Sequence, residues 1–194
     1  MGYKWVLPVL VAGFLLLGGC ASTGIEPGTG DIAFRLLWTG PADLDLRVED
    51  PAGHQLSFIL RECAGGGVLD VDCNSSPQEI CPRPIENIYW PPGRAPEGVY
   101  RARVVFFNPH RGVTSADYTL QVLLGEVGVE QTVGTVSQKE TESEVVDYRF
   151  VRNGPGGPRG GRGAELRFHP HADRPLVLSR DSRELAAVLG KPCD

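Results

Sequence analysis

Short stretches in which apolar and polar residues alternate fill the chain from Asp31 to Phe150. A period of two residues is typical of a β-strand with one buried face, because successive side chains of a strand point to opposite sides. The clearest stretches are IAFRLLWT (32–39), LDLRV (44–48), VYRARVVFF (99–107), DYTLQVLL (117–124) and VVDYRF (145–150); LSFIL (56–60), NIYW (87–90) and EQTVGTV (130–136) are weaker. We find no helical repeat of useful length in residues 31–150. About eight strands with one buried face each predict an all-β domain, an antiparallel two-sheet β-sandwich.

The first 19 residues are typical of a bacterial export signal. Lys4 precedes an apolar run from Trp5 to Gly19, which is shorter than the roughly 20 residues that a membrane-spanning helix needs. The run ends in Leu17-Gly18-Gly19-Cys20, which resembles the lipobox, where signal peptidase II cleaves before a lipidated cysteine. We therefore expect lipidation of Cys20 and a tether over residues 20–30; a cleaved signal without lipid and an uncleaved anchor are the alternatives. Ala21, rather than Asp, follows the cysteine, which favours a cell-envelope protein anchored in the outer membrane, facing the periplasm or the cell surface.

Four cysteines follow Cys20. An even number in an exported chain predicts two disulfides. We expect at least one bridge within the segment from the first to the third of them and a second that reaches the C-terminus. The spacing contains no CxxC pair, which argues against zinc. The disulfide candidates are Cys63, Cys73, Cys81 and Cys193.

Aspartates recur two residues apart in two of the expected strand regions. DLDLRVED (43–50) contains Asp43 and Asp45, and GVLDVDC (67–73) contains Asp70 and Asp72. Each pair shares one face of its strand, opposite the apolar residues. Aspartate is a poor strand former, and like charges that meet across a sheet destabilise it. The pattern therefore raises the question of which cation balances these charges.

Ca²⁺ is one candidate ligand, since it binds six to eight oxygens in flexible geometry. Glu86 and Asn87 would add side-chain oxygens if the two segments meet. Pairing with arginine, or hydrogen bonds to loop amides, is the second interpretation, and simple exposure on a solvated strand face is the third. The arginines in the same region are Arg35, Arg47, Arg61 and Arg83.

The region after the predicted sandwich has a different composition. Residues 151–164 are a Gly/Pro linker containing NGPGGPRGGRG, and residues 165–194 form a basic tail. The tail is expected to contain a strand over ELRFH (165–169) and a short C-terminal helix over DSRELAAVLG (181–190), with Asp181 as the N-cap and Gly190 as the stop. Docking of this tail on the acidic domain, and contact with anionic lipid, are the two alternatives.

The order of several motifs resembles the bacterial YfaP-like domain, a family of unknown function. LLWTGPADLDLRVEDPAG, GVLDVD, ENIYWPPGRAPEGVYRARVVFF and DYTLQVLLGE carry the resemblance, which covers roughly Phe34 to Phe150. It implies that residues 31–150 form an exported or surface-associated domain without an established reaction. The chain departs from the family at Arg47, where histidine is expected, and in the cysteine-bearing insert from Cys63 to Cys81.

These observations favour a lipid-anchored envelope protein with a non-catalytic binding or structural module. Its partners would be the membrane, through the lipid, and a protein or glycan. Nucleic acid is not expected, because loss of Lys4 with the signal changes the formal charge from −5 to −6. A carbohydrate-binding module in which Trp90 stacks on a sugar is one alternative, and a hydrolase with a carboxylate pair is another. The chain has no GxSxG, HExxH or P-loop motif, so we expect no enzyme; FHPHAD (168–173) is expected to be a surface loop and not a metal site.

Overall fold

The computed structural model describes residues 25–152 and 164–170, with side-chain surroundings for 25–152. This part of the chain is all-β, as the sequence predicts. Its only helical element is a three-residue 3-10 helix, η1 (His110–Gly112). The strands are β1 (Gly30–Trp38), β2 (Asp43–Glu49), β3 (Gln55–Leu56), β4 (Val68–Asp72), β5 (Ile85–Trp90), β6 (Gly98–Asn108), β7 (Ser115–Gly125), β8 (Val127–Ser137), β9 (Val146–Arg152) and β10 (Ala164–Pro170).

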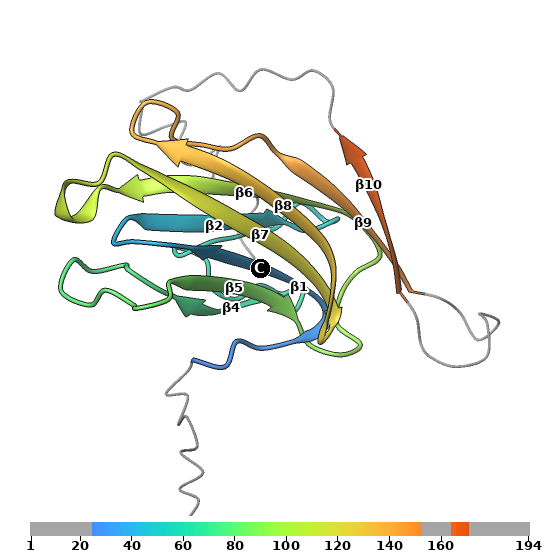
Figure 1. The fold of residues 1–194 in the computed structure, drawn as a ribbon. Helices are drawn as coiled ribbons and strands as arrows, with labels where there is room; N and C mark the ends of the chain where they lie inside the picture. The colour runs from blue at the N-terminus through green and yellow to red at the C-terminus, as the bar shows by residue number, and fades with distance from the viewer. Residues whose placement is uncertain (1–24, 153–163, 171–194) are drawn as a thin grey trace, which may run out of the picture.

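The strands form two antiparallel sheets, which confirms the predicted sandwich (Figure 1). One sheet has the order β4-β5-β1-β7-β8, and the other has the order β10-β9-β6-β2-β3. All strand pairs are antiparallel. None of the described elements is a helix long and apolar enough to cross a membrane.

The core lies between the sheets and contains the residues that the alternation places inside. Phe34 of β1 contacts the rings of Trp90, Tyr100 and Tyr148 at centroid distances of 5.5–6.2 Å. These aromatic side chains have 0–1% exposure. Edge-to-face aromatic pairs add to the stability that comes from burying their area. The predicted inward positions are confirmed, apart from Leu124 and Val146, which are only partly buried.

The strand expected over residues 56–60 differs from the one observed, β3, which ends at Leu56. LSFIL was expected to be a strand, but only its first residue belongs to one, because Ser57 donates a backbone hydrogen bond to Leu60 and the chain turns. Residues 57–63 then pass from one sheet to the other, where Glu62 bridges Val68 of β4. This crossover closes one edge of the sandwich beside β2.

The expected tail strand is present as β10. It pairs with β9 from Ala164 opposite Arg152 to Pro170 opposite Val146, so it extends the sheet of the sandwich. Figure 1 shows it beside β9 at the edge. Four expectations concern residues outside the described ranges: the signal peptide, lipidation of Cys20, the helix over 181–190 and a disulfide to Cys193.

Candidate cation site between the two sheets

Four of the predicted carboxylates come close together at one edge of the sandwich, where β2 of one sheet approaches β4 and β5 of the other. Asp43 and Asp45 belong to β2, Asp72 to β4 and Glu86 to β5, so each sheet contributes two of them. The exposed fractions of Asp43, Asp45 and Glu86 are 2%, 3% and 0%. Asp43 and Asp45 alternate with the core residues Leu44 and Leu46, as expected, but their burial rules out the third interpretation, simple exposure on a solvated face. We call these four residues the acidic cluster.

Glu86 reaches its position because it is an inward-facing residue of β5. It lies opposite Leu36 of β1, and its Oε2 accepts a hydrogen bond of 2.5 Å from the backbone N–H of Leu46 in the other sheet. That N–H is available because β3 pairs only with Val48 and Glu49 of β2. A buried backbone N–H needs an acceptor, so the Glu86 carboxylate supplies across the sandwich what a longer β3 would have supplied within the sheet.

A bulge in β4 decides which of its aspartates joins the acidic cluster. Leu69 lies opposite Ile88, whereas Val71 lies opposite Asn87, so Asp70 is the extra residue. Asp70 accepts hydrogen bonds from the Gly28 N–H at 2.6 Å and from Asn87 Nδ2 at 2.8 Å. This matches the loop-amide interpretation, and the structure does not bring Asp70 into the cluster.

Asp72 lies beyond the bulge, directly opposite Glu86. Residues directly opposite in an antiparallel pair share one face of the sheet. Asp72 is therefore adjacent to Glu86, although it alternates with the core residues Val71 and Cys73 and stays partly exposed. Its carboxylate acts electrostatically on Asp43, Asp45 and Glu86.

The electrostatics of the acidic cluster are those of buried like charges. Burial, with a contribution from Asp72, raises the pKa of Asp43 to about 7. Burial, followed by the charge of Asp43, raises the pKa of Asp45 to about 7, against an opposing effect of Arg47. Burial and the charges of Asp45 and Asp72 hold the pKa of Glu86 well above its usual range. Without a cation, Asp43 and Asp45 take up protons near neutral pH.

Three oxygens of the acidic cluster are buried without a hydrogen-bond partner among the described residues: Asp43 Oδ1, Asp45 Oδ2 and Glu86 Oε1. A buried polar atom without a partner costs free energy. All three are carboxylate oxygens of neighbouring, electrostatically coupled residues, which is the type of ligand atom that a hard cation binds.

Basic side chains account for only part of this negative charge. Arg61 Nη1 lies 2.8 Å from Asp72 Oδ2. Arg47 contacts Glu142 at 3.4 Å, and that carboxylate also contacts Arg103. The arginine interpretation therefore applies to Asp72, whereas Asp43, Asp45 and Glu86 have no lysine or arginine within 4.0 Å among the described residues.

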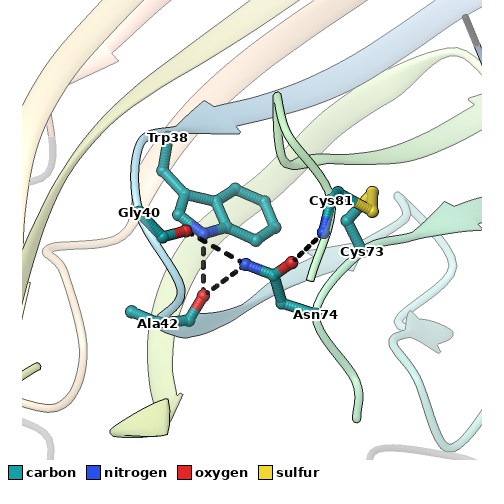
Figure 2. Close-up of a disulfide and its surroundings, with 6 residues drawn as sticks. All are labelled: Trp38, Gly40, Ala42, Cys73, Asn74 and Cys81. Atoms are coloured by element: carbon teal, nitrogen blue, oxygen red, sulfur yellow. Dashed lines mark hydrogen bonds between the residues drawn. A yellow bond between two sulfur atoms is a disulfide. The ribbon is translucent and has the colours of Figure 1, made fainter. Parts of the chain in front are cut away.

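A hydrogen-bonded loop fixes the end of the site next to Asp43 and Asp72 (Figure 2). Cys73 and Cys81 form one of the predicted disulfides. Asn74, between them, has φ of 67°, a left-handed conformation that asparagine tolerates better than most residues. Its Nδ2 donates to the Gly40 and Ala42 carbonyls, and its Oδ1 accepts from the Cys81 N–H at 2.9 Å.

Two further side chains complete this end of the site. Trp38 Nε1 donates to the Ala42 carbonyl at 2.8 Å, as Figure 2 shows. His110 Nε2 lies 2.9 Å from the Asn74 carbonyl oxygen and 3.8 Å from Asp43 Oδ2. The roles of Asn74 and His110 have no local signal in the sequence, because the contacts of Asn74 with Ala42 and with His110 each join segments more than 30 residues apart.

A second group of possible metal ligands lies near the β3 end of the sandwich. Asp50, His54 and Cys63 place one ligand atom each within 4.8 Å of one another. Cys63 is disulfide-bonded, so it offers no thiolate, and Asp50 instead accepts hydrogen bonds from the Ala52 and His54 N–H groups. Asp50 and His54 thus belong to a hydrogen-bonded turn, and the disulfide-bonded Cys63 lies beside it. These contacts account for the group without a metal ion. The acidic cluster does not form such a compact triad in the described residues.

Trp90 is in the core and not on a ligand-binding face. Its exposure is 0%, and its ring lies 4.8 Å from that of Tyr100. The predicted sugar-stacking role of Trp90 is therefore wrong, since a stacking platform must be exposed. An open groove of about 480 Å³ lies elsewhere, beside β7 and β8, and Asp117 is the only carboxylate in its lining.

No protein family, curated protein or solved structure matches this chain.

Proposed function

We propose that this chain is a lipid-anchored protein of the cell envelope whose β-sandwich is a non-catalytic binding or structural module, stabilised by Ca²⁺ bound between its sheets. The observation that supports a bound cation is the presence of three buried oxygens without hydrogen-bond partners, on Asp43, Asp45 and Glu86. The sequence before Cys20 supports the anchor, and the resemblance to YfaP-like domains supports a module that acts without catalysis.

The residues of the acidic cluster suit Ca²⁺ better than other common cations. The cluster offers only carboxylate oxygens, whereas zinc sites prefer nitrogen and sulfur donors. The nearby nitrogen, His110 Nε2, is within hydrogen-bond distance of the Asn74 carbonyl oxygen, at 2.9 Å. Mg²⁺ demands near-ideal octahedral geometry, whereas Ca²⁺ accepts irregular sets of six to eight oxygens at 2.3–2.6 Å. Oxygens on opposite sides of one Ca²⁺ are about 5 Å apart, which is the spacing that carboxylates of the two sheets would adopt around the ion.

The buried position of these carboxylates gives less support to a hydrolase. A glycosidase needs two carboxylates on either side of a substrate in an open cleft, but Asp43, Asp45 and Glu86 are at most 3% exposed. A cation of this site would instead join the two sheets, because its ligands come from both. Its expected role is therefore to hold the sandwich and its Cys73–Cys81 loop in a binding-competent shape.

Calcium-dependent stability tests this proposal. We expect the purified, oxidised protein to bind one Ca²⁺ in isothermal titration calorimetry, with Kd of about 10⁻⁴ to 10⁻³ M, the range of extracellular modules. A tenfold excess of Ca²⁺ over Kd should add about 1.4 kcal/mol to the free energy of unfolding and raise Tm by several degrees relative to EDTA.

Two glutamine variants make the test specific to the site. Glu86→Gln keeps an oxygen to accept the Leu46 N–H but removes the charge, so it should weaken Ca²⁺ binding at least tenfold. Glu126→Gln changes an exposed carboxylate in the turn between β7 and β8 and should bind like the wild type. A wild-type protein that neither binds Ca²⁺ nor changes its Tm would exclude the cation from the proposed function.

A further inference from the structure

The acidic cluster is most accessible at Asp72. The side chain of Asp72 is 11% exposed, whereas the other three members of the cluster are at most 3% exposed. An ion that enters the site without separating the sheets therefore reaches Asp72 first. The group already bound there is the guanidinium of Arg61, whose Nη1 donates to Asp72 Oδ2 at 2.8 Å.

The crossover segment between β3 and β4 fixes the backbone of Arg61 at this entrance. The Leu69 N–H donates to the Arg61 carbonyl oxygen at 2.7 Å, and the next residue, Glu62, bridges Val68. The side chain is 47% exposed and has no other hydrogen bond among the described residues. Its backbone is thus held beside β4, while its guanidinium is free to leave Asp72 for solvent.

No other described basic side chain balances the acidic cluster as directly. Arg47 shares Glu142 with Arg103. The Nε2 of His110 is within hydrogen-bond distance of the Asn74 carbonyl oxygen, at 2.9 Å, and only at 3.8 Å from Asp43. A proton on that nitrogen is therefore directed to the carbonyl oxygen. Arg61 is the one arginine of the described chain that contacts a cluster carboxylate.

We propose that Arg61 is a displaceable counter-cation, which competes with Ca²⁺ for Asp72 and so sets the affinity of the site. This inference rests on the proposed cation site. Exposed ion pairs contribute little net stability, so Ca²⁺ displaces the half-exposed guanidinium at small cost. After Arg61 leaves Asp72, its positive charge is still nearby and repels the bound divalent ion. Arg61 thus occupies Asp72 at low Ca²⁺ and returns to solvent at high Ca²⁺.

Calorimetric titration of the full-length protein with CaCl₂ at pH 8 tests the role of Arg61. Arg61→Gln removes the competing charge and should lower Kd by about three- to tenfold. Arg61→Lys keeps the charge and should stay within about twofold of the wild type. Arg101→Gln is the matched control, because Arg101 is 44% exposed and pairs with Glu49 at 2.7 Å, outside the acidic cluster; its Kd should equal that of the wild type.

The outcomes separate this inference from the function on which it rests. A lower Kd for Arg61→Gln alone supports the counter-cation. An unchanged or higher Kd in that variant, with Ca²⁺ binding by the wild type, overturns the role of Arg61 and leaves the cation site intact. Absence of Ca²⁺ binding by the wild type and by Arg61→Gln alike overturns both proposals, and circular dichroism of each variant confirms that the fold is retained.

Discussion

Replacing Asp45 by asparagine should stabilise the protein when no cation is present and destabilise it, relative to wild type, when Ca²⁺ is present. Asp45 is 3% exposed, one of its oxygens has no partner, and its pKa rises from 3.8 to about 7 on folding. A group whose pKa is raised by folding contributes most to stability below its unfolded pKa, and that contribution is lost as pH rises through the folded pKa. The ionised Asp45 of the cation-free protein therefore opposes folding above pH 7.

The size of the effect follows from the pKa change. A rise of about 3 pKa units corresponds to about 4 kcal/mol at pH 8, where Asp45 is ionised in both states. At pH 5 the folded protein holds the proton while the unfolded chain is mostly ionised, so the same linkage leaves about 2 kcal/mol. Asparagine has no charge to bury. The stability gained by Asp45→Asn should thus be about 2 kcal/mol larger at pH 8 than at pH 5, whatever the packing effect of the amide.

Thermal unfolding in EDTA and in 10 mM Ca²⁺, at both pH values, measures this. At roughly 3 °C per kcal/mol, the variant should gain about 6 °C more at pH 8 than at pH 5 in EDTA. In Ca²⁺ at pH 8 the wild type should gain stability, while the variant, which lacks a ligand, gains less. A change in Tm that is equal at both pH values and unaffected by Ca²⁺ would show that Asp45 is an ordinary buried polar residue, and the electrostatic reasoning would be refuted.

Three further predictions concern the anchor, the disulfide and the core. Cys20→Ala should abolish incorporation of radiolabelled palmitate in a bacterial host, and labelling of the variant equal to that of the wild type would refute the lipobox. Loss of the disulfide in a Cys73→Ser/Cys81→Ser variant should lower the free energy of unfolding by about 2–3 kcal/mol, as expected for a loop closed over a sequence separation of 8, measured by urea denaturation. Gly30→Ala should lower the free energy of unfolding by more than 2 kcal/mol in the same assay, because a Cβ at this position overlaps the backbone of Trp90. Gly128→Ala is the control, since no atom lies within 4 Å of its Cβ. Equal effects of the two changes would contradict the structure.

The fold was predictable because one physical signal repeats along the chain. Each strand buries alternate side chains, so Ile32, Phe34 and Leu36 identify their inner face without knowledge of any partner strand. The order of strands within the sheets has no such local signal, since it depends on contacts between distant segments. The exact extent of β3 was missed for the same reason: Leu56 to Leu60 has the composition of a strand, but a turn at Ser57 carries the chain to the other sheet.

The sequence identified the residues of the acidic cluster but not how they are arranged or buried. Asp43, Asp45, Asp72 and Glu86 were all candidate ligands, but alternation placed the aspartates of β2 only on the face opposite the core. It could not decide between exposure and burial, because a pattern within one strand does not reveal what covers its outer face. Phe58, after β3, contacts Phe107 of β6 across β2 at a ring distance of 5.0 Å, and neither residue is near β2 in sequence. The burial that raises the pKa of Asp45 is thus a property of the assembled edge.

Asp70 and Asp72 have different partners, because the bulge in β4 shifts the pairing with β5 by one residue between them. Without a bulge, residues two apart on β4 would share a face, and both aspartates would join Glu86 or neither would. The extra residue moves Asp70 to Gly28 and Asn87 and sets Asp72 opposite Glu86. This bulge contains no glycine and depends on the pairing of β4 with β5, so the sequence of β4 alone does not reveal it. A fifth carboxylate in the cluster would have added repulsion, and Arg61 is the one described arginine that contacts a cluster carboxylate, so the position of Asp70 limits the acidic charge that a cation at this site would have to balance.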